Sequence, residues 1–321
     1  MMHDNVTALF GLPGAENIEV RVFERTSLSL PVDPQYVFRK DELKLILAYL
    51  CTETDGDGLY LHGPFGAGKT SLAKQVLARL NWPTLMTSWK KSSEIDDLVG
   101  RTGAKYGDTI FELGPLALAM KHGYALIINE IDRGMADNLI GLNDILDGGY
   151  LLIKETGEII ERHPDFRLIV TGNSGGMGDA SGQYIGSVRK LDPAFLDRFV
   201  FLHIDYMDAA NEIDLLLRAF PTYTGEFVSR MVNFASETRL KAADITEILS
   251  LAISTRALRR FFRLGMSFGL DNYRYDDVPA DKLMRALRPS YLDRLQPEEQ
   301  TAAMVIFTMT TGIPTDAEQA A

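Results

Sequence analysis

A glycine-rich segment with the sequence GPFGAGKT carries the clearest chemical signal in the chain. It begins at Gly63, ends at Thr70 and fits the pattern GxxxxGK[ST]. An apolar run at 59–61 precedes it and a helical pattern at 71–80 follows it, which is the strand–loop–helix context that this pattern requires. Glycine lets backbone N–H groups approach phosphate oxygens, and the helix N-terminus adds partial positive charge. The segment therefore predicts a phosphate-binding loop.

The residue types in this loop fit ATP with Mg²⁺. Lys69 is expected to reach the β- and γ-phosphates, and the Thr70 hydroxyl is expected to ligate Mg²⁺. The residues expected to contact ATP are Gly63, Pro64, Phe65, Gly66, Ala67, Gly68, Lys69, Thr70 and Ser71. The alternative is a glycine-rich turn that only begins a helix, and the matching context favours the phosphate site.

A polar pair, Asn129 and Glu130, follows an apolar run at 125–128. Phosphate-loop NTPases usually have Asp at the first of these positions, where it holds the water shell of the metal. Asn129 can still accept a hydrogen bond from a metal-bound water, but it adds no negative charge beside Mg²⁺, so we expect weaker metal binding or slower hydrolysis. Glu130 is expected to be the base that activates the attacking water. The alternative is an ordinary strand end.

Three further polar residues follow in chain order. Asn173 comes after an apolar run at 168–171 and could hold the lytic water, although Asn after a strand is also a common turn former. Arg198 could contact the γ-phosphate bound to a neighbouring subunit, or could instead form a surface pair with Asp197. Arg256, at the start of a helical segment, could contact the nucleotide from that side.

The elements that must position these residues alternate along the middle of the chain. Apolar runs predict strands at 59–61, 84–88, 124–128, 166–171 and 200–204. Helical patterns occur at 41–50, 71–80 and 115–121. This alternation predicts an α/β fold with a parallel five-stranded sheet covered on both faces.

The pattern changes on both sides of this region. Residues 1–40 have no strong periodicity, so we expect an extended lead-in segment. After Tyr206 the expected elements are all helical, at 209–219, 226–234, 246–253 and 256–268. The predicted organisation is therefore a lead-in at 1–40, a nucleotide-binding domain at 41–206, and a helical lid with a C-terminal tail at 207–321.

The charge balance of the chain argues against nucleic acid as the main partner. The 321 residues contain 33 Lys+Arg and 44 Asp+Glu, which gives a formal charge of −11 and disfavours an electrostatic hold on phosphate backbones. One helical segment could still contact nucleic acid through a basic run with aromatic neighbours. Its residues are Arg259, Arg260, Phe261, Phe262 and Arg263. A partly solvated or subunit-interface face is the favoured interpretation of this run.

Other composition features narrow the class of protein. The single cysteine excludes an internal disulfide framework, and the five histidines show no HExxH or CxxC spacing. No window approaches the roughly 18 apolar residues that a membrane span needs. We therefore expect a cytoplasmic protein with no membrane partner.

The order of the motifs resembles that of the AAA+ ATPases. GPFGAGKT is followed by ALIINEID, LIVTGN, LDPAFLDRF and STRAL. Within that superfamily the chain is most similar to the MoxR-like branch, and there to the small ATPase subunits of aerobic cobaltochelatases. Residues 28–265 carry this resemblance, with supporting stretches at 30–38, 78–83, 95–100 and 176–184. The tail after Leu270 has no counterpart that we recognise.

The resemblance implies an αβα sandwich with a C-terminal helical lid, assembled as a homo-oligomeric ring of six subunits, with ATP between the subunits. It implies that Asn173 is sensor 1, Arg198 a finger acting in trans and Arg256 sensor 2. Two inserted hairpins, at 105–114 and 151–160, would face the pore or a partner, the alternative being plain hairpins. The implied partner carries a von Willebrand factor A-type domain.

Three functions remain open from the sequence. The first is a Mg²⁺-dependent ATPase that remodels a partner protein, with a metal-insertion role resting on resemblance alone. The second is a nucleotide-gated scaffold in which Asn129 weakens hydrolysis. The third is a DNA-directed motor, which the acidic charge balance disfavours.

Overall fold

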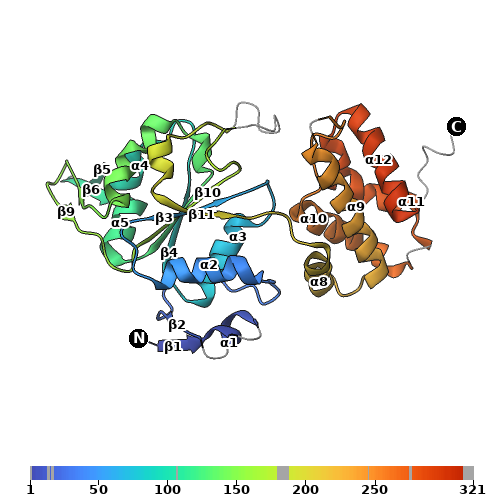
Figure 1. Ribbon diagram of the computed structural model, residues 1–321, viewed down its shortest axis with the longest axis horizontal. Coiled ribbons are helices and arrows are strands. Elements are labelled where there is room, and N and C mark those ends of the chain that lie inside the picture. The colour runs from blue at the N-terminus through green and yellow to red at the C-terminus, as the bar shows by residue number, and fades with distance from the viewer. Residues whose placement is uncertain are drawn as a thin grey trace. The chain divides into compact units, whose positions relative to one another are not determined.

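The chain forms two compact units, each with its own hydrophobic core. The first consists of Met1–Pro64 and Lys69–Ile204, and the second of Phe65–Gly68 and Asp205–Ala321 (Figure 1). This computed structural model describes residues 2–12, 15, 18–105, 108–178, 188–244, 246–274 and 277–313.

A five-stranded sheet with the order β11-β3-β10-β7-β4 forms the centre of the first unit. Every pairing in it is parallel. Its strands are β3 (Gly58–His62), β4 (Thr84–Ser88), β7 (Ala125–Asn129), β10 (Arg167–Gly172) and β11 (Phe199–His203). The predicted parallel sheet is confirmed. Apolar runs of this length predict such strands well because parallel strands are buried on both faces.

Helices cover both faces of this sheet. On one face, Leu126 and Ile128 share a hydrophobic cluster with Leu116 and Met120 of α5 (Pro115–His122). Ile127 points to the opposite face and is also fully buried. The other helices of this unit are α1 (Val6–Phe10), α2 (Lys40–Cys51), α3 (Lys69–Arg79), α4 (Ile95–Val99), α6 (Asn143–Leu146) and α7 (Pro193–Leu196). The unit is therefore an αβα sandwich, as the sequence predicts.

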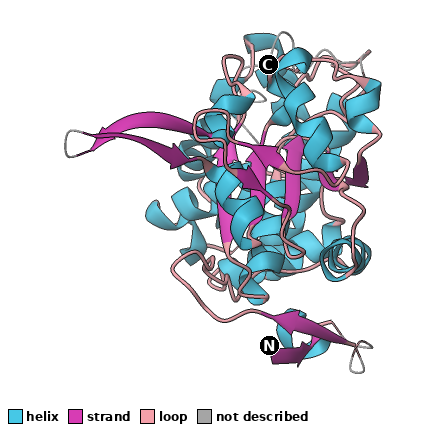
Figure 2. Cartoon of the chain, turned by 90° about the vertical axis from the view of Figure 1, so that its left-hand side faces the viewer, coloured by secondary structure: helices cyan, strands magenta, loops and turns pink. Residues whose placement is uncertain are grey.

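Two antiparallel hairpins extend from the sandwich, near the two places where the sequence predicts them. The first pairs β5 (Gly100–Lys105) with β6 (Asp108–Leu113), so it begins five residues before the predicted segment. Figure 2 shows this hairpin projecting from the body of its unit. The second pairs β8 (Leu151–Leu152) with β9 (Ile159–Ile160).

The expectation of an extended lead-in at 1–40 is wrong for its first half. β1 (Met2–Asn5) pairs with β2 (Glu19–Val22), and α1 lies between them in the chain. The buried Phe10 ring packs edge-on against Phe38 at 5.2 Å, and Arg21 forms an ion pair with Asp165 of the sandwich. Elements of four or five residues are too short to show a periodicity, which is why the sequence did not reveal them.

The second unit is helical in its described residues, as predicted for the lid. Its helices are α8 (Ala209–Ala219), α9 (Gly225–Ala243), α10 (Thr255–Ser267), α11 (Ala280–Ser290) and α12 (Pro297–Thr311). Their apolar faces pack around Phe234, Phe262 and Phe307, all fully buried.

The helix expected at 246–253 is wrong, because the described residues there are turns and coil. Side chains of other helices satisfy the backbone of this segment. The Ser250 N–H donates to Glu299 Oε1 at 2.7 Å, and the Ile253 N–H donates to Thr238 Oγ1 at 3.1 Å. Helical spacing of apolar residues therefore does not yield a helix here, since the N–H groups have other acceptors.

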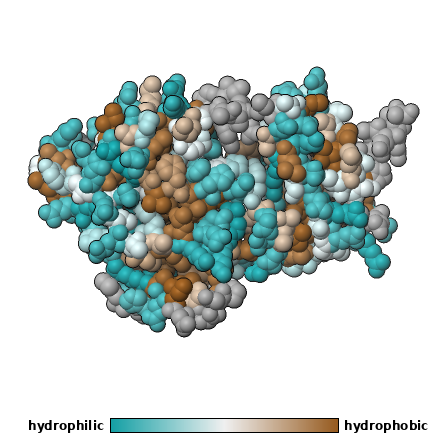
Figure 3. Space-filling view, in the orientation of Figure 1, coloured by the Kyte–Doolittle hydropathy of each residue, from teal (hydrophilic) through white to brown (hydrophobic). Residues whose placement is uncertain are grey.

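The surface has the mixture of polar and apolar side chains that is usual for a globular protein of this composition. Hydrophilic side chains are interspersed with hydrophobic ones on the face drawn in Figure 3. No helix within the described residues is both long and apolar enough to cross a membrane.

Candidate nucleotide site

The carboxyl ends of β3, β7 and β10 bring the predicted site residues of the first unit together. The ammonium of Lys69, at the start of α3, donates to the carbonyls of Gly63 at 2.7 Å and Pro64 at 2.9 Å. It also donates to Asn173 Oδ1 at 3.1 Å. Lys69 is only 8% exposed, so its charge is held at the mouth of the loop by oxygen acceptors. A phosphate oxygen offers the same kind of acceptor, with a negative charge in addition.

Thr70 and Asn129, the two residues predicted to bind metal, are in direct contact. The Thr70 hydroxyl donates to Asn129 Oδ1 at 2.7 Å, and Asn129 Nδ2 donates to the Thr87 carbonyl at 3.1 Å. This donor set is made of hard oxygens, which suits Mg²⁺, but both oxygens are neutral. The described residues also contain no group of three or more His, Cys, Asp or Glu side chains that could hold a metal ion by itself. The residues therefore fit a Mg²⁺ ion that arrives with nucleotide phosphates.

Glu130 lies directly after β7 in the left-handed backbone region, with φ of 58°. Its side chain is about half exposed, and Oε2 accepts from Arg133 Nε at 2.8 Å. Non-glycine residues adopt this conformation at a cost of about 1 kcal/mol or more, and such residues cluster at functional sites. The predicted base is therefore beside the site but paired with an arginine in this structure.

Asp132 is a site residue that the sequence analysis did not assign. It is fully buried, and its Oδ2 accepts from the N–H groups of Asn173 at 2.7 Å and Ser174 at 2.9 Å. Burial raises the pKa of this carboxyl, while these N–H groups act in the opposite direction. Asp132 therefore fixes the loop that carries Asn173. The available signal was an acidic residue two positions after Glu130, separated from it by the apolar Ile131.

Gly172 shows how tightly this loop is packed. A Cβ at Gly172 would lie 2.2 Å from the Tyr60 hydroxyl oxygen and 2.9 Å from Asp132 Oδ2. The same hydroxyl donates to the Ser174 carbonyl at 2.9 Å. Only glycine fits at this position, and its lack of a side chain lets the Tyr60 hydroxyl and the Asp132 carboxylate pack against the end of β10.

The tip of the glycine loop, Phe65–Gly68, belongs to the second unit together with Arg256. Gly66 has φ of 74°, and a Cβ there would lie 2.5 Å from Cβ of Ser254, the residue that caps α10. The Cβ of Arg256 lies 3.8 Å from the same point, and the arginine side chain is exposed. The second unit therefore brings the predicted Arg256 next to the loop tip.

Arg198 lies elsewhere in the first unit and is not brought to the loop. Its Nε and Nη2 donate to the two carboxylate oxygens of Asp147, at 2.7 and 2.8 Å. These hydrogen bonds lower the pKa of the Asp147 carboxyl and raise the pKa of the Arg198 guanidinium. The described ion pairs of Arg198 therefore involve Asp147 and not the neighbouring Asp197 that the sequence suggested.

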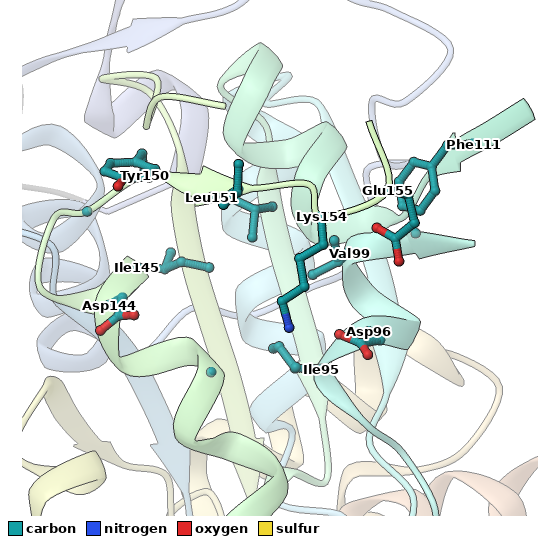
Figure 4. A pocket seen from close by; sticks show the side chains of 14 residues that line it. Ile95, Asp96, Val99, Phe111, Asp144, Ile145, Tyr150, Leu151, Lys154 and Glu155 are labelled. Atoms are coloured by element: carbon teal, nitrogen blue, oxygen red, sulfur yellow. The ribbon is translucent and has the colours of Figure 1, made fainter. Parts of the chain in front are cut away.

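A cavity of about 570 Å³ lies where the two hairpins join the sandwich (Figure 4). Residues of both hairpins line it, including Phe111 and Leu151. The Lys154 side chain extends into the cavity toward the side where Asp96 lies. None of the predicted site residues lines this cavity. The sequence predicts each hairpin separately, but not that residues 111 and 151 share a cavity.

The sheet order, the glycine loop and the polar residues at its edge define a P-loop protein of the AAA+ class. A family model described as an AAA domain of the dynein-related subfamily matches residues 58–199. The aerobic cobaltochelatase subunit CobS of Sinorhizobium sp is 30% identical over 265 residues, which cover 79% of this chain and 77% of that protein. Protein NorQ of Paracoccus denitrificans is 28% identical over 225 residues, which cover 70% of this chain and 77% of that protein.

These similarities show that the chain belongs to the MoxR-like AAA+ ATPases, as its motifs predict. A RuvB variant from Thermotoga maritima superposes with a TM-score of 0.51 at 15% identity, covering 81% of this chain and 77% of RuvB. At that identity the likeness supports the fold alone.

Proposed function

We propose that this chain binds ATP with Mg²⁺ at the edge of its sheet and hydrolyses it to ADP and phosphate. The observation that carries the proposal is the contact between Lys69 and Asn173, since residues 104 positions apart meet at 3.1 Å beside the glycine loop. Membership of the AAA+ ATPases supports it further, because nucleotide binding is general in that class.

Each side chain then has a distinct role. Lys69 neutralises phosphate charge, and Asn173 orients the attacking water. Glu130 accepts a proton from that water once its carboxylate leaves Arg133. Thr70, and Asn129 through a water molecule, would hold Mg²⁺, which would supply charge neutralisation at the phosphates.

We propose further that the protein works as a homo-oligomeric ring, of six subunits, in the cytoplasm. In such a ring Arg198 of one subunit contacts the γ-phosphate held by the next, and Arg256 contacts the nucleotide from its own helical unit. Ring assembly is general among AAA+ proteins, which supports this arrangement.

The proposed work of the ring is to remodel a partner protein with a von Willebrand factor A-type domain. The projecting β5–β6 hairpin supports a partner-directed role, because it extends away from the body of its unit. The similarity to a subunit named for aerobic cobaltochelatase makes metal insertion a candidate process for that partner.

Steady-state ATP hydrolysis tests the proposed activity. Wild-type protein should hydrolyse ATP only with Mg²⁺ present, and Lys69→Ala should abolish hydrolysis. Glu130→Gln should lower the hydrolysis rate about a hundredfold or more while leaving nucleotide binding intact. Wild-type rates in the Glu130→Gln protein would remove the assignment of the base.

A nucleotide-gated scaffold is the second candidate. Two observations favour it. Asn129 adds no charge at the metal position, and Glu130 is paired with Arg133. In that case ATP promotes assembly, measured by light scattering, with no measurable hydrolysis, and Glu130→Gln assembles as wild type does.

The DNA-directed alternative has less support. Phe261 and Phe262 are almost completely buried, so they are not available to stack on bases. Filter binding with single- and double-stranded DNA at moderate salt, with and without ATP, should detect no tight complex. Tight, salt-sensitive binding would favour a DNA motor.

A further inference from the structure

Two histidines face each other at the end of the sheet, immediately before the glycine loop. His62 ends β3 and His203 ends β11, and the strand register pairs these two residues directly. Their Nδ1 atoms lie 3.5 Å apart. They are 141 residues apart in the chain, so the sequence, which lacks HExxH or CxxC spacing, did not suggest the pair.

The separation suits a shared metal ion better than a hydrogen bond. Side-chain hydrogen bonds between nitrogen atoms and their acceptors are usually near 2.9–3.0 Å, and 3.5 Å is at the outer limit. Two imidazole nitrogens that bind one tetrahedral ion, each at about 2.0–2.1 Å, lie about 3.4 Å apart. We propose that His62 and His203 form a binding site for one divalent transition-metal ion of the Zn²⁺ or Co²⁺ type.

The two rings are held on rigid elements and remain accessible. Adjacent parallel strands fix the two Cα positions, and the Tyr60 and Phe201 rings lie 6.2 and 5.8 Å from the His62 ring. His62 is half-buried while His203 is exposed, so an ion can reach the pair from solvent. A site built on paired strands needs little rearrangement to bind.

Metal binding at the pair requires both imidazole rings to be neutral, because only the neutral ring has a lone pair for a metal. Water molecules would complete the coordination, because no third His, Cys, Asp or Glu joins the pair among the described residues.

This site is chemically distinct from the proposed Mg²⁺ position. Imidazole nitrogen suits Zn²⁺, Co²⁺ and Ni²⁺, whereas Mg²⁺ prefers oxygen ligands. His62 is directly followed by Gly63, whose carbonyl accepts from Lys69, so an ion on the pair would lie close to the phosphate site. Occupation of the pair is therefore expected to change nucleotide affinity.

Titration of the full chain with CoCl₂, without nucleotide, tests the site. We expect saturable binding of one ion per chain, seen by calorimetry and by the visible absorption of bound Co²⁺. His203→Asn and His62→Asn should each lower the affinity by about tenfold or more. The exposed His122, whose ring stacks on Tyr124, provides the control, and His122→Asn should bind Co²⁺ as wild type does.

Three outcomes would overturn the proposal. The first is that wild-type protein binds no Co²⁺. The second is that both His62→Asn and His203→Asn bind Co²⁺ as wild type does. The third is that His122→Asn loses as much affinity as they do. His203 lies on an edge strand and is exposed, so His203→Asn gives an answer even if His62→Asn does not fold. Because no hydrolysis is measured, a negative result leaves the proposed ATPase activity unaffected.

Discussion

Arg198 and Asp147 form a two-point ion pair within one chain, with the guanidinium nitrogens 2.7 and 2.8 Å from the two carboxylate oxygens. Arg198 also donates to the Ala194 carbonyl at 2.6 Å. If Arg198 serves a neighbouring subunit, as we propose, it has to leave these partners, and Asp147 would then compete with the phosphate for the guanidinium.

Mixed rings test whether Arg198 acts on a neighbouring subunit. Arg198→Ala alone should lower the hydrolysis rate by a factor on the order of 10³, since a finger arginine neutralises transition-state charge. Lys69→Ala chains are also inactive but keep Arg198. Mixing the two inactive proteins should restore hydrolysis, because an intact loop then meets an intact arginine. No recovery in stable mixed rings would place the arginine's action within its own chain.

Restoring a carboxylate at position 129 should raise hydrolysis. Asn129→Asp adds a negative charge beside the Thr70 hydroxyl, now 2.7 Å from the amide oxygen, and so strengthens Mg²⁺ binding. We expect a lower Mg²⁺ concentration for half-maximal hydrolysis and a higher kcat. An unchanged Mg²⁺ dependence would show that the amide does not limit the reaction. Asn233→Asp, at an exposed position of α9, serves as a charge control.

The sequence predicts the sandwich well because its information is local. The strands β3, β7, β10 and β11 each contain a continuous apolar run, and the glycine loop needs only eight adjacent residues. The missed features depend on partners far apart in the chain. Asp132 becomes a site residue only when the loop after β10 reaches it, and the coil at 246–253 depends on acceptors supplied by α9 and α12.

Removing the Asp132 carboxylate should impair both folding and catalysis. Asp132→Ala leaves the partly buried N–H groups of Asn173 and Ser174 without this acceptor, so the free energy of unfolding should fall by about 2 kcal/mol. Because Asp132 acts by positioning Asn173, kcat should fall in this variant while KM for ATP changes little. Asp132→Asn should recover part of both, and the exposed Asp137→Ala should change neither. Equal losses in kcat for the alanine and asparagine variants would contradict this role.

A helix cap in the second unit should give a measurable pH dependence. Asp208 caps α8, and the Asn211 N–H that donates to it at 2.9 Å lowers the pKa of the carboxyl. A lowered folded-state pKa stabilises the fold above the unfolded pKa of about 3.9, and this contribution is lost as the pH falls below that value. Asp208→Ala should therefore cost about 1 kcal/mol at pH 7 and less at pH 3, measured by urea unfolding. Asp208→Asn keeps the cap and should show a smaller change in stability between the two pH values.

A buried ion pair in the second unit should be costly to break. Glu212 is fully buried and accepts from Arg239 at 2.7 and 2.8 Å and from the Thr255 hydroxyl at 2.6 Å. Arg239→Ala leaves that carboxylate buried without its cation, so we expect a loss of about 3–5 kcal/mol in the free energy of unfolding.

The surface pair between Arg218 and Asp214 provides the matched control for this loss. Both of its side chains are about half exposed, so Arg218→Ala should cost less than about 1 kcal/mol. Because Thr255 begins the helix that carries Arg256, the Arg239 variant should also weaken ATP binding, measured by calorimetry below its unfolding temperature. Equal stability losses in the two arginine variants would show that the buried carboxylate finds another partner.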